Sequence, residues 1–127
     1  MELTKKDLKL IQKAKKIISK THVRNKKIVS DVVSIIITEK GNMFYGVDIE
    51  GLVPGSGVCA EISAITNMIL AGKENDKIKT CLALYGEPKY KKKIYEILPP
   101  CNKCRKNLKK FGNPWVFISD TKKEKLK

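Results

Sequence analysis

The distribution of positive charge constrains this chain more than any other feature of its sequence. The 127 residues include 27 lysines and arginines against 13 acidic residues, a formal net charge of +14. Residues 41–72 nevertheless contain no basic residue at all. In so basic a chain, a long stretch without lysine is expected either to be buried or to form a site where an ammonium group would be harmful.

The length predicts a single domain spanning residues 1–127, because a chain of this size can bury one hydrophobic core but not two. A hydrophobic content of 42% is typical of a globular protein. No apolar run is long enough for a transmembrane helix, and the N-terminus lacks the pattern of a secretory signal, so we expect a cytoplasmic protein without membrane contact. In that compartment the four cysteines stay reduced and are available for metal or catalysis.

Hydrophobic periodicity predicts helices alternating with strands. Helices are expected at residues 4–20, 59–71 and 101–111, the first capped by Thr4 and Asp7 and the other two ended by Gly72 and Gly112. Strands are expected at residues 31–38, 43–50, 77–85 and 114–119, with a short extended segment at 93–98. Residues 21–29 are expected to be a polar loop, and residues 120–127 a flexible basic tail. This order predicts an α/β fold, a three-layer α/β/α sandwich with one mixed sheet.

Three cysteines have the spacing of metal ligands. Cys101 and Cys104 lie three residues apart at the start of a predicted helix, so both sulfurs fall on one face of its first turn. Cys59 starts another predicted helix, and helix N-termini favour thiolates, the form that binds metal. Three thiolates on Zn²⁺ leave the fourth tetrahedral position open for water, which is typical of a catalytic site. Glu61, two residues beyond Cys59, is close enough to share a proton of that water without being a ligand.

The two motifs, Cys59-Ala60-Glu61 and Pro100-Cys101-Asn102-Lys103-Cys104, resemble the signature of the zinc-dependent cytidine deaminase superfamily. The run GVDIE, followed after eight residues by CAE, resembles the corresponding stretch of free-nucleoside cytidine deaminases and blasticidin S deaminases. The order of the predicted elements is also that of the family. The resemblance extends over roughly residues 4–119.

This resemblance implies a hydrolytic deaminase of a cytosine-type nucleoside with one zinc ion per chain. Zinc hydroxide would attack the amine-bearing ring carbon, and Glu61 would carry the proton to the ring nitrogen and the departing amine. The backbone near Ala60 would bind the base, and Asp48 and Glu50 would bind the sugar. Asp48 stands where the family usually has asparagine, and a carboxylate can accept a hydrogen bond from a hydroxyl group but cannot donate one. The family also implies a homo-oligomer, with a tetramer favoured over a dimer.

The sequence leaves other functions open. One is detoxification of an antibiotic by a blasticidin S deaminase-type enzyme, and another is deamination of bases within RNA or DNA. The lysines favour nucleic acid, with the run Lys89–Lys93 the best candidate for phosphate contacts. The acidic segment around Glu61 and the scarcity of arginine argue against it. The third alternative is a non-catalytic, zinc-stabilised nucleic-acid-binding module. Cys81, in an apolar strand, is expected to be a buried hydrophobic residue rather than a ligand.

Overall fold

The computed structural model describes residues 1–24, 27–28, 30–49, 57–87 and 94–126. Glu50 and the run Lys89–Lys93, both singled out from the sequence, lie outside these ranges. The elements in chain order are α1 (Lys5–Thr21), β1 (Val23–Arg24), β2 (Lys27–Ile28), β3 (Val32–Thr38), β4 (Met43–Val47), α2 (Ala60–Leu70), β5 (Ile78–Glu87), β6 (Ile94–Ile97), α3 (Asn102–Lys110), β7 (Gly112–Phe117) and β8 (Lys123–Lys125).

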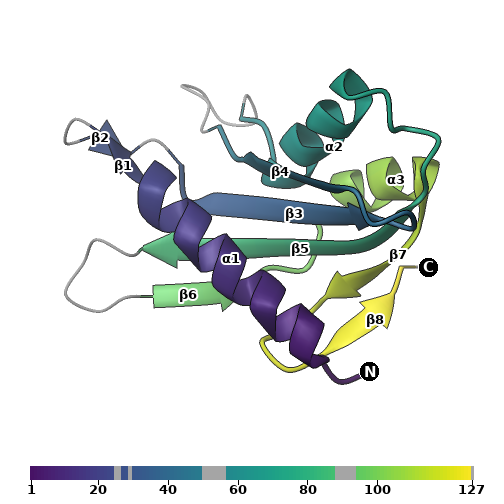
Figure 1. Cartoon of the computed structure of the whole chain (residues 1–127). Helices are drawn as coiled ribbons and strands as arrows, with labels where there is room; N and C mark the ends of the chain where they lie inside the picture. The colour runs from purple at the N-terminus through teal and green to yellow at the C-terminus, as the bar shows by residue number, and fades with distance from the viewer. Residues whose placement is uncertain (25–26, 29, 50–56, 88–93, 127) are drawn as a thin grey trace.

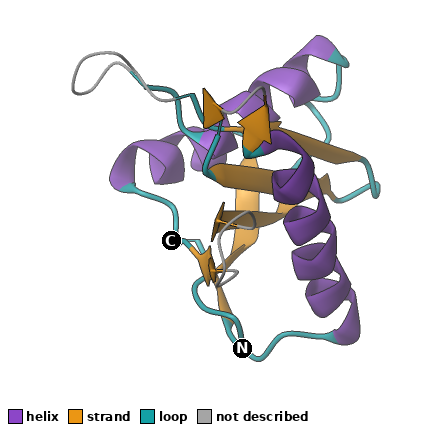
Figure 2. Cartoon of the chain, turned by 90° about the vertical axis from the view of Figure 1, so that its left-hand side faces the viewer, coloured by secondary structure: helices purple, strands orange, loops and turns teal. Residues whose placement is uncertain are grey.

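A six-stranded mixed sheet forms the middle layer, with α1 on one face and α2 and α3 on the other (Figures 1 and 2). This is the predicted three-layer sandwich. No helix within the described ranges is both long and apolar enough to cross a membrane.

Strand β5 is the centre of the sheet and decides where the site lies. One of its edges pairs antiparallel with β3, and β3 pairs antiparallel with β4. Its other edge is shared, since β7 pairs in parallel with its first half and β6 pairs antiparallel with its second half. After β6 the chain turns away at the point along β5 where pairing with β6 gives way to pairing with β7. There the Leu98 N–H donates to the Ala83 carbonyl at 2.9 Å. Helix α3 therefore begins beside the middle of β5.

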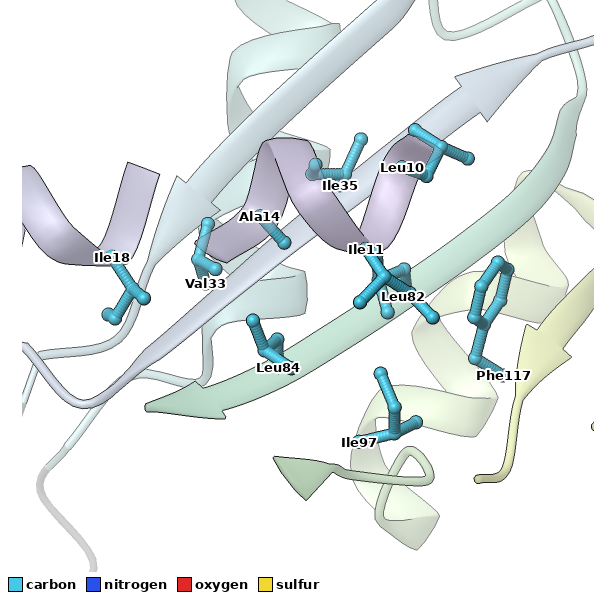
Figure 3. Close-up of a cluster of buried hydrophobic side chains, with 10 residues drawn as sticks. All are labelled: Leu10, Ile11, Ala14, Ile18, Val33, Ile35, Leu82, Leu84, Ile97 and Phe117. Atoms are coloured by element: carbon cyan, nitrogen blue, oxygen red, sulfur yellow. The ribbon is translucent and has the colours of Figure 1, made fainter. Parts of the chain in front are cut away.

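Successive side chains of β3 and β5 point to opposite faces of the sheet, so each strand contributes to two hydrophobic cores. Val33 and Ile35 of β3, with Leu82 and Leu84 of β5, pack against the apolar stripe of α1 (Figure 3). The intervening residues of the same strands, such as Ile36 and Cys81, face α2 and α3. The second core includes Ala64, Ile65 and Met68 of α2, Leu108 of α3 and Leu126 near the C-terminus.

Two glycines allow close or unusual backbone geometry in the layer that holds the site. A Cβ atom on Gly46 of β4 would lie 2.5 Å from the Ala64 nitrogen and from the Ser63 Cβ, so glycine is what lets α2 approach β4. Gly72 adopts a left-handed φ of 71° just after α2, as expected for a helix-terminating glycine.

Two expectations about irregular segments were wrong. Residues 21–29 contain a small antiparallel ribbon, in which β1 pairs with β2, rather than only a polar loop. Strands of two residues are too short to show periodicity in a sequence. The region expected to be a flexible tail contains β8, which pairs antiparallel with β7.

The tail is held in place by side chains at its buried positions. Leu126 is 2% exposed and belongs to the second core. Lys123 is also buried, and its Nζ atom lies 2.8 Å from the Asp7 Oδ2 atom of α1. A charge-based interpretation of this basic segment missed that one of its lysines has a buried acidic partner.

Candidate metal centre

The three predicted ligands converge at the N-termini of two helices. Cys59 is the N-cap residue of α2, Cys101 is the N-cap residue of α3, and Cys104 lies in the first turn of α3. Their three Sγ atoms all lie within 4.8 Å of one another. Among the described residues, these cysteines are the group of metal-ligating side chains that could hold an ion.

Backbone contacts fix both cysteine segments. Ile49 and Val58 form an isolated antiparallel bridge with N–H to O distances of 2.9 and 2.8 Å, so the residue before Cys59 is tied to the chain beyond β4. The Leu98 hydrogen bond to β5 does the same for the approach to Cys101. Neither N-cap cysteine makes a side-chain capping hydrogen bond, which leaves both sulfurs for another partner.

The donor set fits a zinc ion. Zn–S bonds of about 2.3 Å place the sulfurs of a tetrahedral site about 3.8 Å apart, so small side-chain movements would suffice here. Three thiols are soft ligands, which favour zinc over hard cations such as magnesium. Cys104 is fully buried, Cys59 is half-buried and Cys101 is exposed, so the group lies at a boundary between core and solvent.

The structure corrects the expectation that helix N-termini drive all three thiols toward thiolate. The pKa of Cys101 is lowered, chiefly because the backbone N–H groups of Cys104 and Lys103 lie near its sulfur and stabilise the thiolate electrostatically. Burial instead raises the pKa of Cys59 and of Cys104. Desolvation of the thiolate is the largest cause at those two positions, so a bound cation is needed to favour three thiolates together.

Glu61 lies in the first turn of α2 and is 7% exposed. Burial raises its pKa above the ordinary value for glutamate, and the nearby negative charge of Asp48 acts in the same direction. Hydrogen bonds from its own backbone N–H and from Cys104 oppose the shift without cancelling it. A buried carboxyl with a raised pKa, beside three metal-ligating sulfurs, is a candidate for proton transfer.

A cavity of about 530 Å³ opens over this group. Its lining brings together residues from several elements, including Cys59, Ala60, Glu61 and Cys101. Val32 and Ala83 contribute apolar wall from β3 and β5, and Lys103 of α3 contributes a cation. The volume lies within the range of small-molecule sites, and an apolar wall with a few polar groups is typical of them.

The residues predicted to bind substrate are placed as follows. Ala60 is buried and lines the cavity, and Asp48 lines the same cavity. The Asp48 Oδ1 atom accepts hydrogen bonds from the N–H groups of Asp31 and Val32 at 2.9 and 3.0 Å. Asp48 therefore also has a structural task, because it secures the start of β3. Glu50 is outside the described residues.

Cys81 and His22, whose side chains can also ligate metals, are not part of the group of three sulfurs. Cys81 is buried in β5 with its Sγ atom 3.8 Å from the Ser34 hydroxyl, and burial raises its pKa to about 12. It is a core residue, as predicted. His22 ends α1, and its Nδ1 atom lies 2.8 Å from the Ser30 carbonyl oxygen and 3.3 Å from the Asp31 Oδ1 atom.

The fold and the site together define an α/β protein whose three cysteines, at two helix N-termini beside a cavity, could bind a metal ion. Residues 4–119 match the model of the cytidine and deoxycytidylate deaminase zinc-binding region. The chain belongs to this family of zinc-binding deaminases.

Solved structures of cytidine deaminases share the fold. The enzyme from Bacillus anthracis is 19% identical, with a TM-score of 0.73 over 93% of this chain and 81% of that one. The Burkholderia pseudomallei enzyme is 20% identical, with a TM-score of 0.70 over 98% and 94% of the two chains. The Mycobacterium leprae enzyme is 17% identical, with a TM-score of 0.67 over 91% and 88%. At these identities the likeness is one of fold.

The walls of the cavity were missed from the sequence. Val32, Ala83 and Leu98 are apolar residues in or beside strands, and nothing in their local pattern separates them from core positions. Strand alternation could have placed Val32 and Ser34 on one side of β3. The sequence does not indicate which side of the sheet adjoins the metal centre, because that depends on where α2 and α3 pack.

Proposed function

We propose that this protein is a zinc-dependent aminohydrolase that removes the amino group from a cytosine-type nucleoside or nucleoside analogue. The proposal rests on one observation, the closeness of the metal-ligating thiols, an acidic side chain and a cavity. Two of the three thiols able to hold a metal, Cys59 and Cys101, line a cavity together with the buried carboxyl of Glu61, and this cavity is large enough for a small molecule. Family membership supports the same reaction class.

Each residue then has a task. Cys59, Cys101 and Cys104 would hold one zinc ion per chain, and zinc, when bound, supplies the Lewis acidity that makes water nucleophilic near neutral pH. The Glu61 carboxylate takes a proton from the attacking water and delivers it to the ring nitrogen. It then transfers the second proton to the exocyclic amine, which leaves as ammonia. A carboxyl group positioned at the reacting atoms is a common general acid–base catalyst.

Substrate binding would use the remaining polar groups of the cavity. The backbone around Ala60 would hydrogen-bond the base, and apolar walls such as Ala83 would exclude water from it. Asp48 would accept a hydrogen bond from a sugar hydroxyl through the carboxylate oxygen that does not bind the start of β3. Glu50 would bind the sugar as well, as the family motif implies.

Ammonia release tests this proposal. Zinc-loaded protein would be incubated with cytidine, deoxycytidine, cytosine, adenosine, guanine and blasticidin S, in parallel with the Glu61→Gln variant. We expect release from a cytosine-type substrate by the wild type alone, with equal zinc content in both proteins. Release from blasticidin S alone would assign the protein to antibiotic detoxification. No release from any compound, at one zinc per chain, would refute the nucleoside proposal.

We also infer that the protein assembles with itself in the cytoplasm, as a tetramer rather than a dimer. Large apolar side chains are exposed in residues 41–72, the segment without basic residues. They include Tyr45 of β4 and, in α2, Ile69 and Leu70, of which Leu70 is 83% exposed. A partner subunit that covers these side chains would remove their apolar surface from water. Light scattering of the purified protein would give the mass directly, and a monomer would contradict the inference.

A further inference from the structure

We propose that the outer face of α3 binds the phosphate backbone of a single-stranded nucleic acid, so that the cavity can receive a base carried on a strand. This inference rests on the deaminase function proposed above and widens its substrate class from free nucleosides to oligonucleotides. It depends on where the lysines of α3 lie relative to two cavities.

Four lysines share one side of α3. The helix buries Cys104 and Leu108, which are four residues apart and face the core. The opposite arc exposes Lys103, Lys106, Lys109 and Lys110, as helical periodicity requires for residues spaced by three and four. Among the described residues, none of these lysines forms an ion pair with a carboxylate. Their charge is therefore available to a mobile anion.

The lysines at the two ends of this exposed side of α3, called here the lysine face, line two different cavities. Lys103, in the first turn of α3, lines the cavity above the metal centre. Lys109 and Lys110, in the last turn, line a second cavity of about 510 Å³. A helix of nine residues spans about 13 Å. The lysine face therefore connects the candidate active site to a second concave surface at that distance.

The second cavity has the composition expected of a strand-binding surface. Lys77, just before β5, and Lys125 of β8 add two further cations. Phe111 supplies a partly exposed ring with the Lys110 Nζ atom 5.6 Å from its centroid. Aromatic rings beside cations bind bases and phosphates without sequence preference. Glu39 and Glu74 also line this cavity, so the cations outnumber the acidic groups by two.

The placement of the lysine charges favours a nucleic-acid strand over a mononucleotide as the ligand. Within the cavity above the metal centre, Lys103 is the cation among residues that include Asp48 and Glu61. A single phosphate would need only that lysine. The remaining lysines extend away from the metal along α3, where only a ligand with further phosphates would reach them.

Binding of a labelled oligonucleotide, at several salt concentrations, tests the inference. The protein would be the zinc-loaded Glu61→Gln variant, and the probe a single-stranded oligonucleotide with one cytosine. Phosphate contacts from the four lysines of α3 give a slope of about −2.8 for log affinity against log salt. The affinity should therefore fall about 50-fold between 50 and 200 mM salt. The further change Lys109→Gln with Lys110→Gln should reduce this loss to about 7-fold. The matched control is Lys9→Gln with Lys13→Gln, two exposed lysines of α1 on the other face of the sheet.

The outcomes separate this inference from the proposed function. A weaker salt dependence for the α3 variant but not for the α1 variant supports the α3 surface. Equal effects of both variants, or a cytidine monophosphate that competes as well as the oligonucleotide, would overturn it. Wild-type protein that releases ammonia from cytidine but binds no oligonucleotide would refute this inference and leave the deaminase standing. Specific oligonucleotide binding without ammonia release from any substrate, free or in a strand, would instead refute the deaminase.

Discussion

Helix α1 and the two helices on the opposite face of the sheet use their N-termini in different ways. The first turn of α1 is closed by a capping box, in which Thr4 and Asp7 each accept a backbone N–H of the other. The first turns of α2 and α3 begin instead with Cys59 and Cys101, which make no capping hydrogen bond. The comparison shows one fold in which one helix start stabilises the chain and two remain available for chemistry.

The buried acids of these helices differ in the same way. Asp7 and Glu61 both lie in a first turn and are 5% and 7% exposed. Burial raises the pKa of Asp7, but hydrogen bonds from Lys123 and Thr4 more than offset this and its pKa is lowered. Glu61 has no cation among the groups that shift its pKa, and its pKa is raised. A paired acid contributes to stability, whereas an unpaired one can exchange protons.

The largest effect is expected from Glu61→Gln. Loss of the proton carrier should lower kcat/KM for the deaminated substrate by about 1000-fold, within the range of general acid–base catalysis. Zinc content and thermal stability should stay close to those of the wild type, since glutamine keeps the size and can keep the hydrogen bonds. Steady-state ammonia release and metal analysis on the same preparations would measure both. Residual activity within a few-fold of wild type would remove Glu61 from the mechanism.

The Asp7 pair should give the largest effect on stability. Lys123→Met keeps the aliphatic stem but leaves the Asp7 carboxylate buried without its partner, so we expect a loss of about 3 kcal/mol in the free energy of unfolding. Urea denaturation measures it. Lys122→Met, at the exposed neighbouring position, should change the value by less than about 0.5 kcal/mol. Equal effects of the two variants would show that the pair does not anchor the tail.

Acid should weaken the same contact. The folded pKa of Asp7 is below its unfolded value, so its contribution is complete above the unfolded pKa and is lost as the pH falls through the folded pKa. The stability difference between wild type and Asp7→Asn should therefore shrink as the pH is lowered below about 4. Urea midpoints between pH 6 and pH 3 would show the trend. A difference that stays constant over this range would mean that Asp7 does not titrate as proposed.

The smallest effect is expected at the cap. Thr4→Ala removes the hydroxyl that accepts the Asp7 N–H at 3.2 Å and should cost about 1 kcal/mol. Thr66→Ala is a suitable control because, among the described residues, the Thr66 hydroxyl donates to carbonyls of its own exposed helix turn. Chemical denaturation of the two variants would distinguish them. A cost at Thr66 as large as that at Thr4 would contradict the special role given to the start of α1.

The sequence by itself determined the periodic elements and the ligand set. The stripe of α1, the β-branched run of β3 and the glycine after α2 follow local rules of helix and strand formation. Cys101 and Cys104 could be paired because three residues of helix bring them to one face, and the Cys59–Glu61 spacing has the same local origin. The Thr4–Asp7 cap was likewise visible, since its contacts lie within one turn.

Only the tertiary structure decided the rest, because those features depend on residues far apart in the chain. The Lys123–Asp7 contact joins positions near opposite ends of the chain, so the tail appeared to be merely basic and solvated. Burial raises the pKa of Cys59, Cys104 and Glu61, and a desolvation cost cannot be read from the N-terminal positions that favour anions. Likewise, the closeness of three sulfurs from two helices follows from how both helices pack on the face of the sheet that includes Ile36 and Cys81.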